Sequence, residues 1–279
     1  MNLAVKVSGA GPRVLLLHCD ASTGAADWKR QEPLAQRWTL VVPDRPGYGD
    51  SPHVRVDFET EPQAHRPLLG DGAHLVGHSY GGVVAMFLAA AEPDRVRSLT
   101  VIEPPALGLS EDPEVVRTRD ELAAVYAEQL DPFDFYTKFC AAIGERPWPR
   151  RPLPPELDAG VRALQREHVP WHARPDLDAL RAAPFPILAV SGGHHPAFEA
   201  VCDTIAEATG AERATVPGRR HMVPLVGEPF NELVETFWSR AETLLDGETS
   251  KRAQTNTLVY TNCDQADRSV RRGDNRACG

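Results

Sequence analysis

The sequence lacks any apolar run that approaches the ~18 residues needed to span a bilayer, so we expect no membrane partner. Its start has no charged stretch followed by an apolar core, and we therefore expect no secretion signal. The five cysteines are odd in number and scattered, which argues against a disulfide framework or zinc-binding spacing and favours a reducing compartment. These absences predict a cytoplasmic protein.

The chain also lacks an excess of positive charge, because its 39 acidic residues outnumber its 30 lysines and arginines. The formal net charge is −9 at pH 7, which argues against nucleic acid as a partner. The chain has no glycine loop that opens on a lysine and no dinucleotide fingerprint. His194 and His195 are adjacent, but no carboxylate-rich sequence surrounds them. We expect a small-molecule substrate, no metal and no cofactor, and the oligomeric state stays open.

Apolar residues are plentiful, since 42% of the 279 residues are hydrophobic. This content suits one α/β domain with an insertion. Residues 246–279 are the exception, because they hold few apolar side chains and cannot bury enough surface to offset the entropy of ordering. We expect this tail to be disordered.

Short apolar segments alternate with helical patterns along most of the chain, which predicts a mostly parallel sheet with right-handed crossovers and helices on both faces. Residues 104–184 interrupt this alternation with helical sequence and proline clusters, and we interpret them as an inserted cap. Residues 1–103 and 185–245 then form the core. The predicted core strands cover 3–8, 13–18, 39–42, 73–76, 96–102, 186–191 and 212–216, and the predicted core helices cover 26–36, 57–69, 83–91, 197–209 and 228–243.

The most informative stretch is residues 77–82, Gly-His-Ser-Tyr-Gly-Gly, which lies between a predicted strand and a predicted helix. Gly-x-Ser-x-Gly in this context forces a sharp turn with Ser79 at its tip. The flanking glycines avoid a collision where strand and helix nearly touch. The start of the helix favours negative charge that develops at the serine. We therefore predict that Ser79 is a nucleophile rather than a helix cap.

A serine hydroxyl is a poor nucleophile until a base takes its proton. His221 lies in the loop after the last predicted strand, at the same carboxyl edge of the sheet as Ser79. This position distinguishes it from the other nine of the ten histidines, which have no such place in the predicted topology. His221 is our predicted base, and an ordinary surface-loop histidine is the alternative.

Three features together resemble an α/β-hydrolase fold enzyme with a helical cap. They are the turn at 77–82, the loop at 44–51 (Asp-Arg-Pro-Gly-Tyr-Gly-Asp-Ser) and the late histidine loop. The resemblance covers roughly residues 3–243 and implies a mostly parallel, eight-stranded sheet and the chain order serine, acid, histidine. It is specific for the fold and only weakly specific for a substrate.

The family's acid usually follows the strand predicted at 186–191, but that loop here reads Gly-Gly-His-His-Pro. Glu103 follows the preceding strand, where some family members, including certain dehalogenases, place their acid. We prefer Glu103, because a carboxylate between an apolar strand and two prolines has no obvious structural reason. Glu199 and a serine–histidine dyad without an acid are the alternatives.

The negative oxygen of a tetrahedral intermediate needs two N–H donors. The resemblance assigns these to the backbone amides of Tyr80 and Asp20. Cys19 stands where the family usually has glycine, and Asp20 adds a carboxylate beside a site that should attract negative charge. Either the Asp20 side chain turns away, or Asp20 takes part in chemistry other than simple ester hydrolysis.

Aromatic residues in the inserted block suggest a mostly apolar substrate with a polar reactive centre. We expect a pocket lined by Trp28, Tyr136, Trp148 and Trp171. The alternative is that the aromatic residues of the block form its own core.

Taken together, these residues predict a serine hydrolase that cleaves a carboxylic ester or lactone of a small, largely apolar substrate through an acyl-enzyme. One alternative keeps the scaffold but performs C–C bond hydrolysis, a lyase reaction or a biosynthetic cyclisation, as the Cys19-Asp20 loop and the relocated acid suggest. The other is a catalytically weak ligand-binding protein, which an absent acid would favour. A haloalkane dehalogenase is disfavoured, because its nucleophile would be aspartate and here is Ser79.

Overall fold

The computed structural model describes residues 1–55, 57–245 and 247. The chain divides into two units, Met1–Trp238 and Ser239–Gly279, and the fold below is that of the first. In the second unit residues 239–245 are helical. Apart from residue 247, the predicted disordered tail at 246–279 lies outside the described residues.

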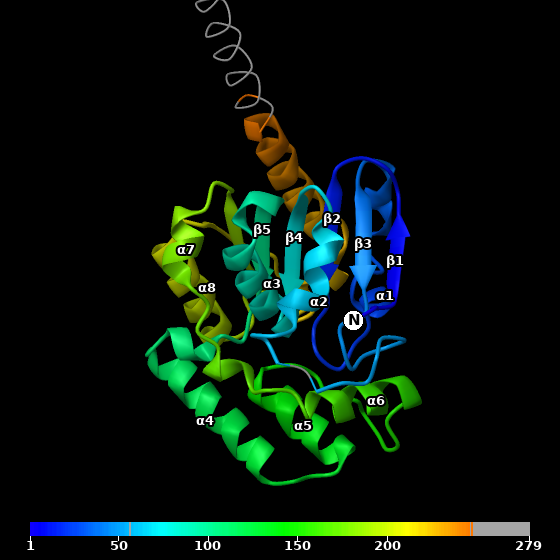
Figure 1. Ribbon diagram of the computed structural model, residues 1–279. Coiled ribbons are helices and arrows are strands. Elements are labelled where there is room, and N and C mark those ends of the chain that lie inside the picture. The colour runs from blue at the N-terminus through cyan, green and yellow to red at the C-terminus, as the bar shows by residue number, and fades with distance from the viewer. Residues whose placement is uncertain (56, 246, 248–279) are drawn as a thin grey trace, which may run out of the picture. The chain divides into compact units, whose positions relative to one another are not determined.

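One sheet forms the centre of the first unit, with the strand order β1-β3-β2-β4-β5-β6-β7 (Figure 1). The β1–β3 pair is antiparallel and every other neighbouring pair is parallel. The strands are β1 (Val5–Ser8), β2 (Arg13–Leu17), β3 (Thr39–Pro43), β4 (Ala73–His78), β5 (Val96–Ile102), β6 (Ile187–Ser191) and β7 (Glu212–Thr215).

All seven segments that we predicted as strands form strands. The eight-stranded sheet implied by the resemblance is wrong for the described residues, whose sheet has seven. The physical reason is that the described residues offer no eighth apolar run of strand length outside the helices, and β1 joins β2 through only four residues, 9–12.

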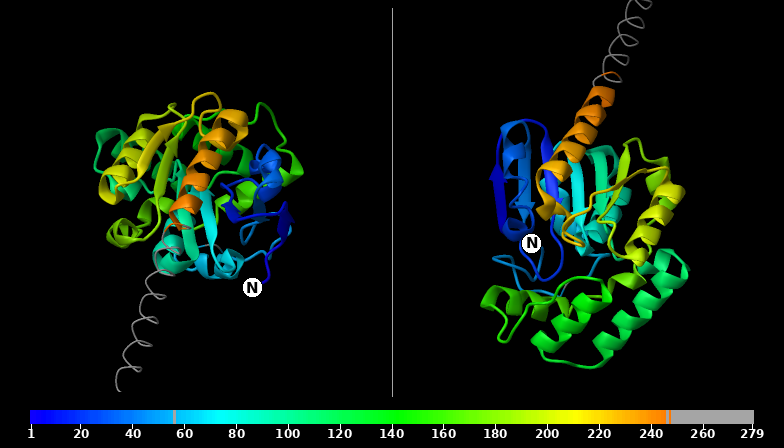
Figure 2. Two further views of the ribbon diagram at one scale, coloured as in Figure 1. Left: turned by 90° about the horizontal axis from the view of Figure 1, so that it is seen from above. Right: turned by 180° about the vertical axis from the view of Figure 1, so that it is seen from behind.

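Helices cover both faces of the sheet (Figures 1 and 2). Helices α3 and α8 pack on one face, around a core that includes Leu75 and Val101. The helical segment 228–238 packs on the other face, around Leu16 and Val76. The α-helices are α1 (Gly24–Asp27), α2 (Pro62–His65), α3 (Tyr80–Ala91), α4 (Pro113–Ala127), α5 (Pro132–Ala142), α6 (Pro155–Leu164), α7 (Leu177–Ala182) and α8 (Pro196–Thr209). The short 3-10 helices are η1 (Glu32–Gln36), η2 (Arg66–Leu69), η3 (Pro93–Arg95), η4 (Leu107–Leu109), η5 (Pro170–His172) and η6 (Val223–Val226).

Two predicted core helices are not continuous. The segment at 26–36 divides into α1 and η1, with Pro33 at the start of the second element. The segment at 57–69 yields α2 and η2, which begin around Pro62 and Pro67. Proline lacks a backbone N–H and fits only the first turn of a helix, so each internal proline starts a new element.

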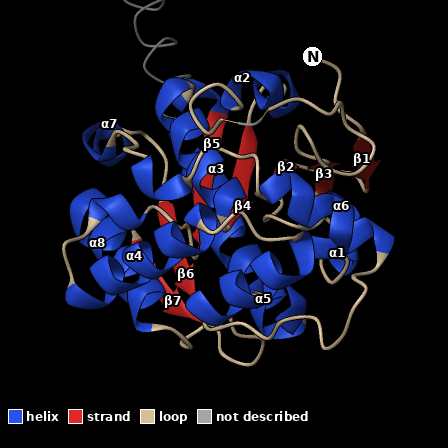
Figure 3. Cartoon of the chain, turned by 90° about the horizontal axis from the view of Figure 1, so that it is seen from below, coloured by secondary structure: helices blue, strands red, loops and turns tan. Residues whose placement is uncertain are grey.

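Between β5 and β6 the chain forms α4, α5, α6 and α7. Helices α4, α5 and α6 lie across the carboxyl ends of the parallel strands (Figures 1 and 3). The side chains of Asp112 and Asp131 accept backbone N–H groups at the starts of α4 and α5. A separate apolar cluster around Phe135 and Val161 packs against Ala21 in the loop after β2. None of the described helices is both long enough and apolar enough to cross a bilayer.

Candidate active site

The register of the central strands places Ser79 beside Glu103. Within the β4–β5 pair His78 lies opposite Ile102, so the residues that follow them are neighbours at the carboxyl edge. The Ser79 amide donates to the Ile102 carbonyl at 2.8 Å, and the Glu103 amide donates to the Val190 carbonyl at 3.0 Å. Two adjacent strands therefore present the hydroxyl and the carboxylate on the same side.

The turn between β4 and α3 holds Ser79 in an uncommon conformation, with φ 54° and ψ −124°. A Cβ at Gly77 would lie 2.2 Å from the Gly81 carbonyl oxygen, and one at Gly81 would lie 2.4 Å from the Leu17 carbonyl oxygen. Only glycine fits at these two positions. Such strain costs roughly 1–3 kcal/mol and persists where the surrounding packing enforces it.

His221, in the loop after β7, lies between the other two groups. Its Nε2 is 2.9 Å from Ser79 Oγ, and its Nδ1 is 2.7 Å from Glu103 Oε2. The Gly192 amide donates to Glu103 Oε1 at 2.6 Å. Burial opposes charge on Glu103, but its contacts with His194 and His221 outweigh burial and lower the pKa of its carboxyl to about 2. The carboxylate is therefore ionised at neutral pH and fixes Nδ1 as the protonated nitrogen, which leaves Nε2 to accept the serine proton.

Glu199, the alternative acid, has other partners. Its carboxylate accepts hydrogen bonds from the Ser191 hydroxyl at 2.8 Å and the Gly193 amide at 3.0 Å. It also forms an ion pair with Arg213 at 2.6 Å. These contacts direct the carboxylate to β7 rather than to His221.

The loop after β2 holds the predicted oxyanion donor. The Asp20 carboxylate accepts a hydrogen bond from Arg45 Nη1 at 3.0 Å, so the side chain turns to Arg45. Among the described residues, neither the Asp20 amide nor the Tyr80 amide has a hydrogen-bond acceptor. His18 Nε2 accepts the Arg45 amide at 2.8 Å and ties the loop after β2 to the loop after β3.

Sequence reasoning missed a buried charge cluster formed by Arg45, Asp20, Glu61 and Glu167, here named the Arg45 cluster. The Arg45 guanidinium donates to Glu61 Oε1 at 2.8 Å and to Glu167 Oε1 at 2.8 Å, besides the bond to Asp20. The Tyr80 ring lies 4.4 Å from the guanidinium carbon. Glu167 belongs to the inserted block, so the cluster joins this block to the loop that carries the Asp20 amide.

Three ionised carboxyl groups around one guanidinium would give the cluster a net charge of −2, and a proton on one of them reduces this to −1. Burial raises the pKa of Glu167 well above its ordinary value, and Asp20 adds to the effect. Burial also opposes charge on Glu61, but Arg45 outweighs it and lowers the pKa of Glu61 to about 2. Glu167 is therefore the group that holds the proton, and the negative charge of nearby Asp20 favours this state.

A stability prediction follows from this proton. Unfolded glutamate ionises above about pH 4.3, whereas folded Glu167 does not, so this group weakens the folded state as pH rises from that value. Glutamine stays neutral at every pH and keeps an acceptor for Arg45. We expect Glu167→Gln to raise the free energy of unfolding at pH 7 by about 1–2 kcal/mol and to match wild type near pH 4.

Urea unfolding at pH 4 to 8 measures this difference. Glu156→Gln is the matched control, because Glu156 is an exposed acid of the same inserted block. A Glu167→Gln protein that is less stable than wild type at pH 7, or that keeps the same pH dependence, contradicts the assignment.

Two groups of side chains bring three ligand atoms within metal-binding distance of one another. In the first, Cys19, Asp27 and His78 are buried. Burial raises the pKa of the Cys19 thiol well above its ordinary value, and a neutral thiol is a poor ligand. In the second, Glu103, His194 and His221 contact one another directly, and these contacts account for the arrangement without an ion.

The four predicted pocket residues have different surroundings. Trp28 is 3% exposed in the core cluster on the face covered by segment 228–238, and Trp171 is 6% exposed in the core of the opposite face. Trp148 is 41% exposed. Tyr136 packs on the cluster of α5 and α6. A pocket lined by these four residues stays a prediction.

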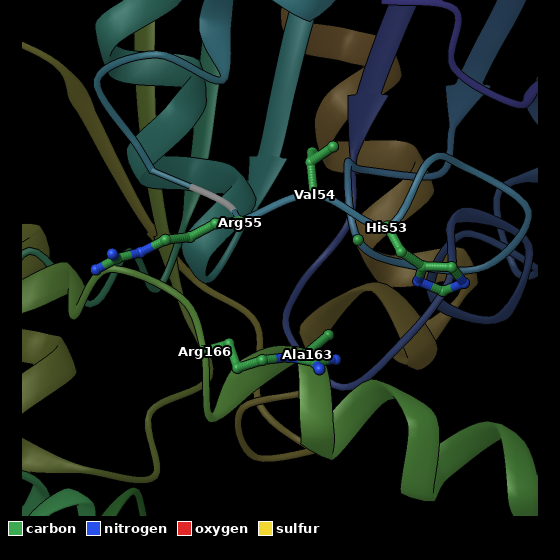
Figure 4. A pocket seen from close by; sticks show the side chains of 6 residues that line it. His53, Val54, Arg55, Ala163 and Arg166 are labelled. Atoms are coloured by element: carbon green, nitrogen blue, oxygen red, sulfur yellow. The ribbon is translucent and has the colours of Figure 1, made fainter.

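Cavities lie instead beside the loop after β3. One of about 390 Å³ is lined by that loop and the facing end of α6 (Figure 4), with the residues Gly47, His53, Val54, Arg55, Ala163 and Arg166. A neighbouring one of about 570 Å³ extends along α6 to Ser22 and Thr23 in the loop after β2. Ser79 and His221 are only 6% and 5% exposed, so both side chains are largely shielded from solvent.

Comparisons with known proteins identify a family. The sequence profile of the alpha/beta hydrolase family matches residues 14–236. A pimeloyl-(acyl-carrier protein) methyl ester esterase of Chromobacterium violaceum is 39% identical over 106 residues, which are 37% of this chain and 41% of that protein. The protein of the same name from Aeromonas hydrophila subsp. hydrophila is 35% identical, with the same coverage of 37% and 41%. The chain thus matches less than half the length of these curated relatives.

Among solved structures, an alpha/beta hydrolase from Sphaerobacter thermophilus superposes with a TM-score of 0.64 and 23% sequence identity. The superposition covers 85% of this chain and 96% of that chain. At this identity the likeness concerns the fold alone.

Proposed function

The chain belongs to the alpha/beta hydrolase family, and we propose that it is a serine hydrolase that cleaves a carboxylic ester or lactone through an acyl-enzyme. The observation that carries the proposal is the continuous contact from Ser79 Oγ through His221 to Glu103, at 2.9 Å and 2.7 Å. Hydroxyl, imidazole and carboxylate in this order form the arrangement that activates a serine.

In the proposed reaction, His221 Nε2 takes the Ser79 proton while Oγ attacks the substrate carbonyl carbon. The Glu103 carboxylate stabilises the imidazolium that forms. His221 then gives the proton to the leaving alcohol oxygen, and the acyl group stays on Oγ. A water molecule loses a proton to His221 and attacks the acyl carbon, which releases the acid and restores Ser79.

We propose that the amides of Tyr80 and Asp20 hold the negative oxygen of each tetrahedral intermediate. Both lack an acceptor among the described residues, and the Tyr80 amide begins helix α3, whose N-terminus favours negative charge. The Asp20 carboxylate does not oppose this role, because Arg45 binds it on the other side of the residue.

We propose that residues 104–184 act as a cap over these groups and select a small, largely apolar substrate. The apolar cluster of α5 and α6, including Tyr136, supports this choice. The curated relatives are named for the methyl ester of an acyl chain, and a methyl ester is one member of the proposed substrate class. The predicted cytoplasmic location stays a prediction; Cys19, Cys140 and Cys202 are free thiols.

Contacts of Asp20 and Glu103 favour ester hydrolysis over the two alternatives, which are non-ester chemistry and ligand binding without catalysis. The Asp20 carboxylate beside the site suggested non-ester chemistry, but Arg45 binds that carboxylate. The absence of an acid would have favoured a catalytically weak, ligand-binding protein, but the Glu103 carboxylate lies 2.7 Å from His221 Nδ1.

The proposal predicts covalent labelling of one residue. We expect a fluorophosphonate to add a single label, located at Ser79 by peptide mass spectrometry, and hydroxylamine to trap the acyl group of an activated ester as a hydroxamate. The reagent reports an activated serine, because ordinary serines do not react. A folded sample that binds esters but neither labels nor turns them over supports the ligand-binding alternative, and turnover without hydroxamate supports the lyase or cyclase alternative.

A further inference from the structure

We propose that His194 is a positioning residue of this site, which as an imidazolium holds the second oxygen of Glu103 and connects that carboxylate to the end of α5. This inference rests on the proposed function. His194 lies in the loop after β6, where the family usually has its acid and where this chain has two histidines instead.

The contacts of Glu103 divide between two imidazoles. Its Oε2 is 2.7 Å from His221 Nδ1, and its Oε1 is 3.3 Å from His194 Nδ1. The rings of His194 and His221 have centroids 6.2 Å apart. Phe198 of α8 stacks on His194 at 6.1 Å and fixes the plane of its ring. Each oxygen of the buried Glu103 carboxylate therefore has an imidazole as its neighbour.

The charge of His194 follows from its two partners. Its Nε2 lies 3.1 Å from the Ile143 carbonyl oxygen, and its Nδ1 lies 3.3 Å from Glu103 Oε1, at ion-pair distance but without the angle of a hydrogen bond. Both partners are acceptors, so each ring nitrogen is best served by a proton. Burial opposes this charge, but Glu103 outweighs burial and raises the pKa of His194.

The Ile143 contact makes His194 a link between the inserted block and the catalytic groups. Ile143 directly follows α5. The next carbonyl, that of Gly144, accepts a hydrogen bond from Arg220 at 2.6 Å, and Arg220 precedes His221. The end of α5 is thus fastened to both loops that carry the imidazoles around Glu103.

Other charged groups lie around His194 and enter the test. His195 in the same loop has its ring centroid 6.0 Å away, and burial lowers its pKa, with the His194 charge adding to the effect. Glu145, beyond the end of α5, adds negative charge near His194. On α4, Arg117 and Glu121 act on His195 with opposite signs. Of the two adjacent histidines, only His194 contacts Glu103.

The test is the pH profile of kcat/KM for an activated ester in the variants His194→Gln and His195→Gln. Loss of a positive charge about 6 Å from His221 makes that base easier to protonate, so the acid limb should move to higher pH by about one pH unit. Glutamine still donates to Glu103 and keeps the fold. We expect kcat on the plateau to fall less than about tenfold and KM to change little.

His195→Gln is the matched control, since it removes an adjacent, neutral imidazole and should leave the limb in place. A folded His194→Gln protein whose limb does not move, or moves no further than that of His195→Gln, overturns the proposal.

A second measurement does not depend on turnover. Nitrogen-15 NMR of wild type at pH 7 should show both ring nitrogens of His194 protonated, and Glu103→Gln should restore a neutral ring. A neutral His194 in wild type also overturns the inference. Absence of esterase activity with a charged His194 would instead refute the proposed function and leave the positioning contact standing.

Discussion

Ser79→Ala is expected to lower kcat for an activated ester by about 10⁴–10⁶-fold, because the nucleophile is lost while the fold and the oxyanion amides stay in place. The same loss is expected for His221→Ala, since a serine without its base does not attack. Because the two groups act as a unit, the double variant should be no slower than either single one. Initial rates with active-site-titrated enzyme measure all three.

Ser22→Ala controls for the loss of a serine hydroxyl close to the site, because Ser22 lies in the loop after β2 and bonds only the Thr23 carbonyl among its described partners. Its rate should stay within about threefold of wild type. If Ser79→Ala retained most of the activity, with circular dichroism unchanged, another nucleophile or another reaction would have to be sought.

Glu103→Gln is expected to lower kcat by about 10³–10⁴-fold. The carboxylate fixes a proton on His221 Nδ1 and stabilises the imidazolium, whereas the glutamine amide can donate to Nδ1 and turn the acceptor nitrogen away from Ser79. KM should change much less, because Glu103 is fully buried behind His221 and does not face a substrate.

Glu199→Gln is the matched control for this change, since it alters a second carboxylate that bonds Ser191, Gly193 and Arg213 rather than His221. We expect a change of less than about threefold. Small and equal effects of both substitutions would favour a dyad of Ser79 and His221, and a large effect of Glu199→Gln alone would reverse our assignment.

The sheet and the positions of the proposed triad were accessible from the sequence because they depend on local patterns. Each strand is a short apolar run bounded by turn residues, and the turn at Ser79 has glycines that nothing else would require. Glu103 was preferred because a carboxylate stood between a buried strand and two prolines. In a parallel sheet, carboxyl ends of neighbouring strands meet, so these separate signals point to one edge.

The Arg45 cluster and His194 were not accessible, because their contacts join distant segments. Arg45 and Glu167 are 122 positions apart, and nothing in either local sequence indicates a buried hydrogen bond between them. The pair of histidines after β6 gave no convincing metal site in the sequence, and the sequence could not show their contacts, which depend on α5 and α8. For the aromatic residues, the sequence does not distinguish side chains that fill the core, as Trp28 and Trp171 do, from side chains that form a binding surface.

The Arg45 cluster also has a consequence for the order in which the molecule is assembled during synthesis. Arg45 and Glu61 leave the ribosome long before Glu167, so the nascent sheet holds a guanidinium whose final partner has yet to be made. The Arg45 cluster is therefore completed only when the inserted block has been synthesised and packs against the core. Removing residues 104–184 to obtain a smaller enzyme would also remove Glu167, and the buried Arg45 guanidinium would lose one of its three carboxyl partners.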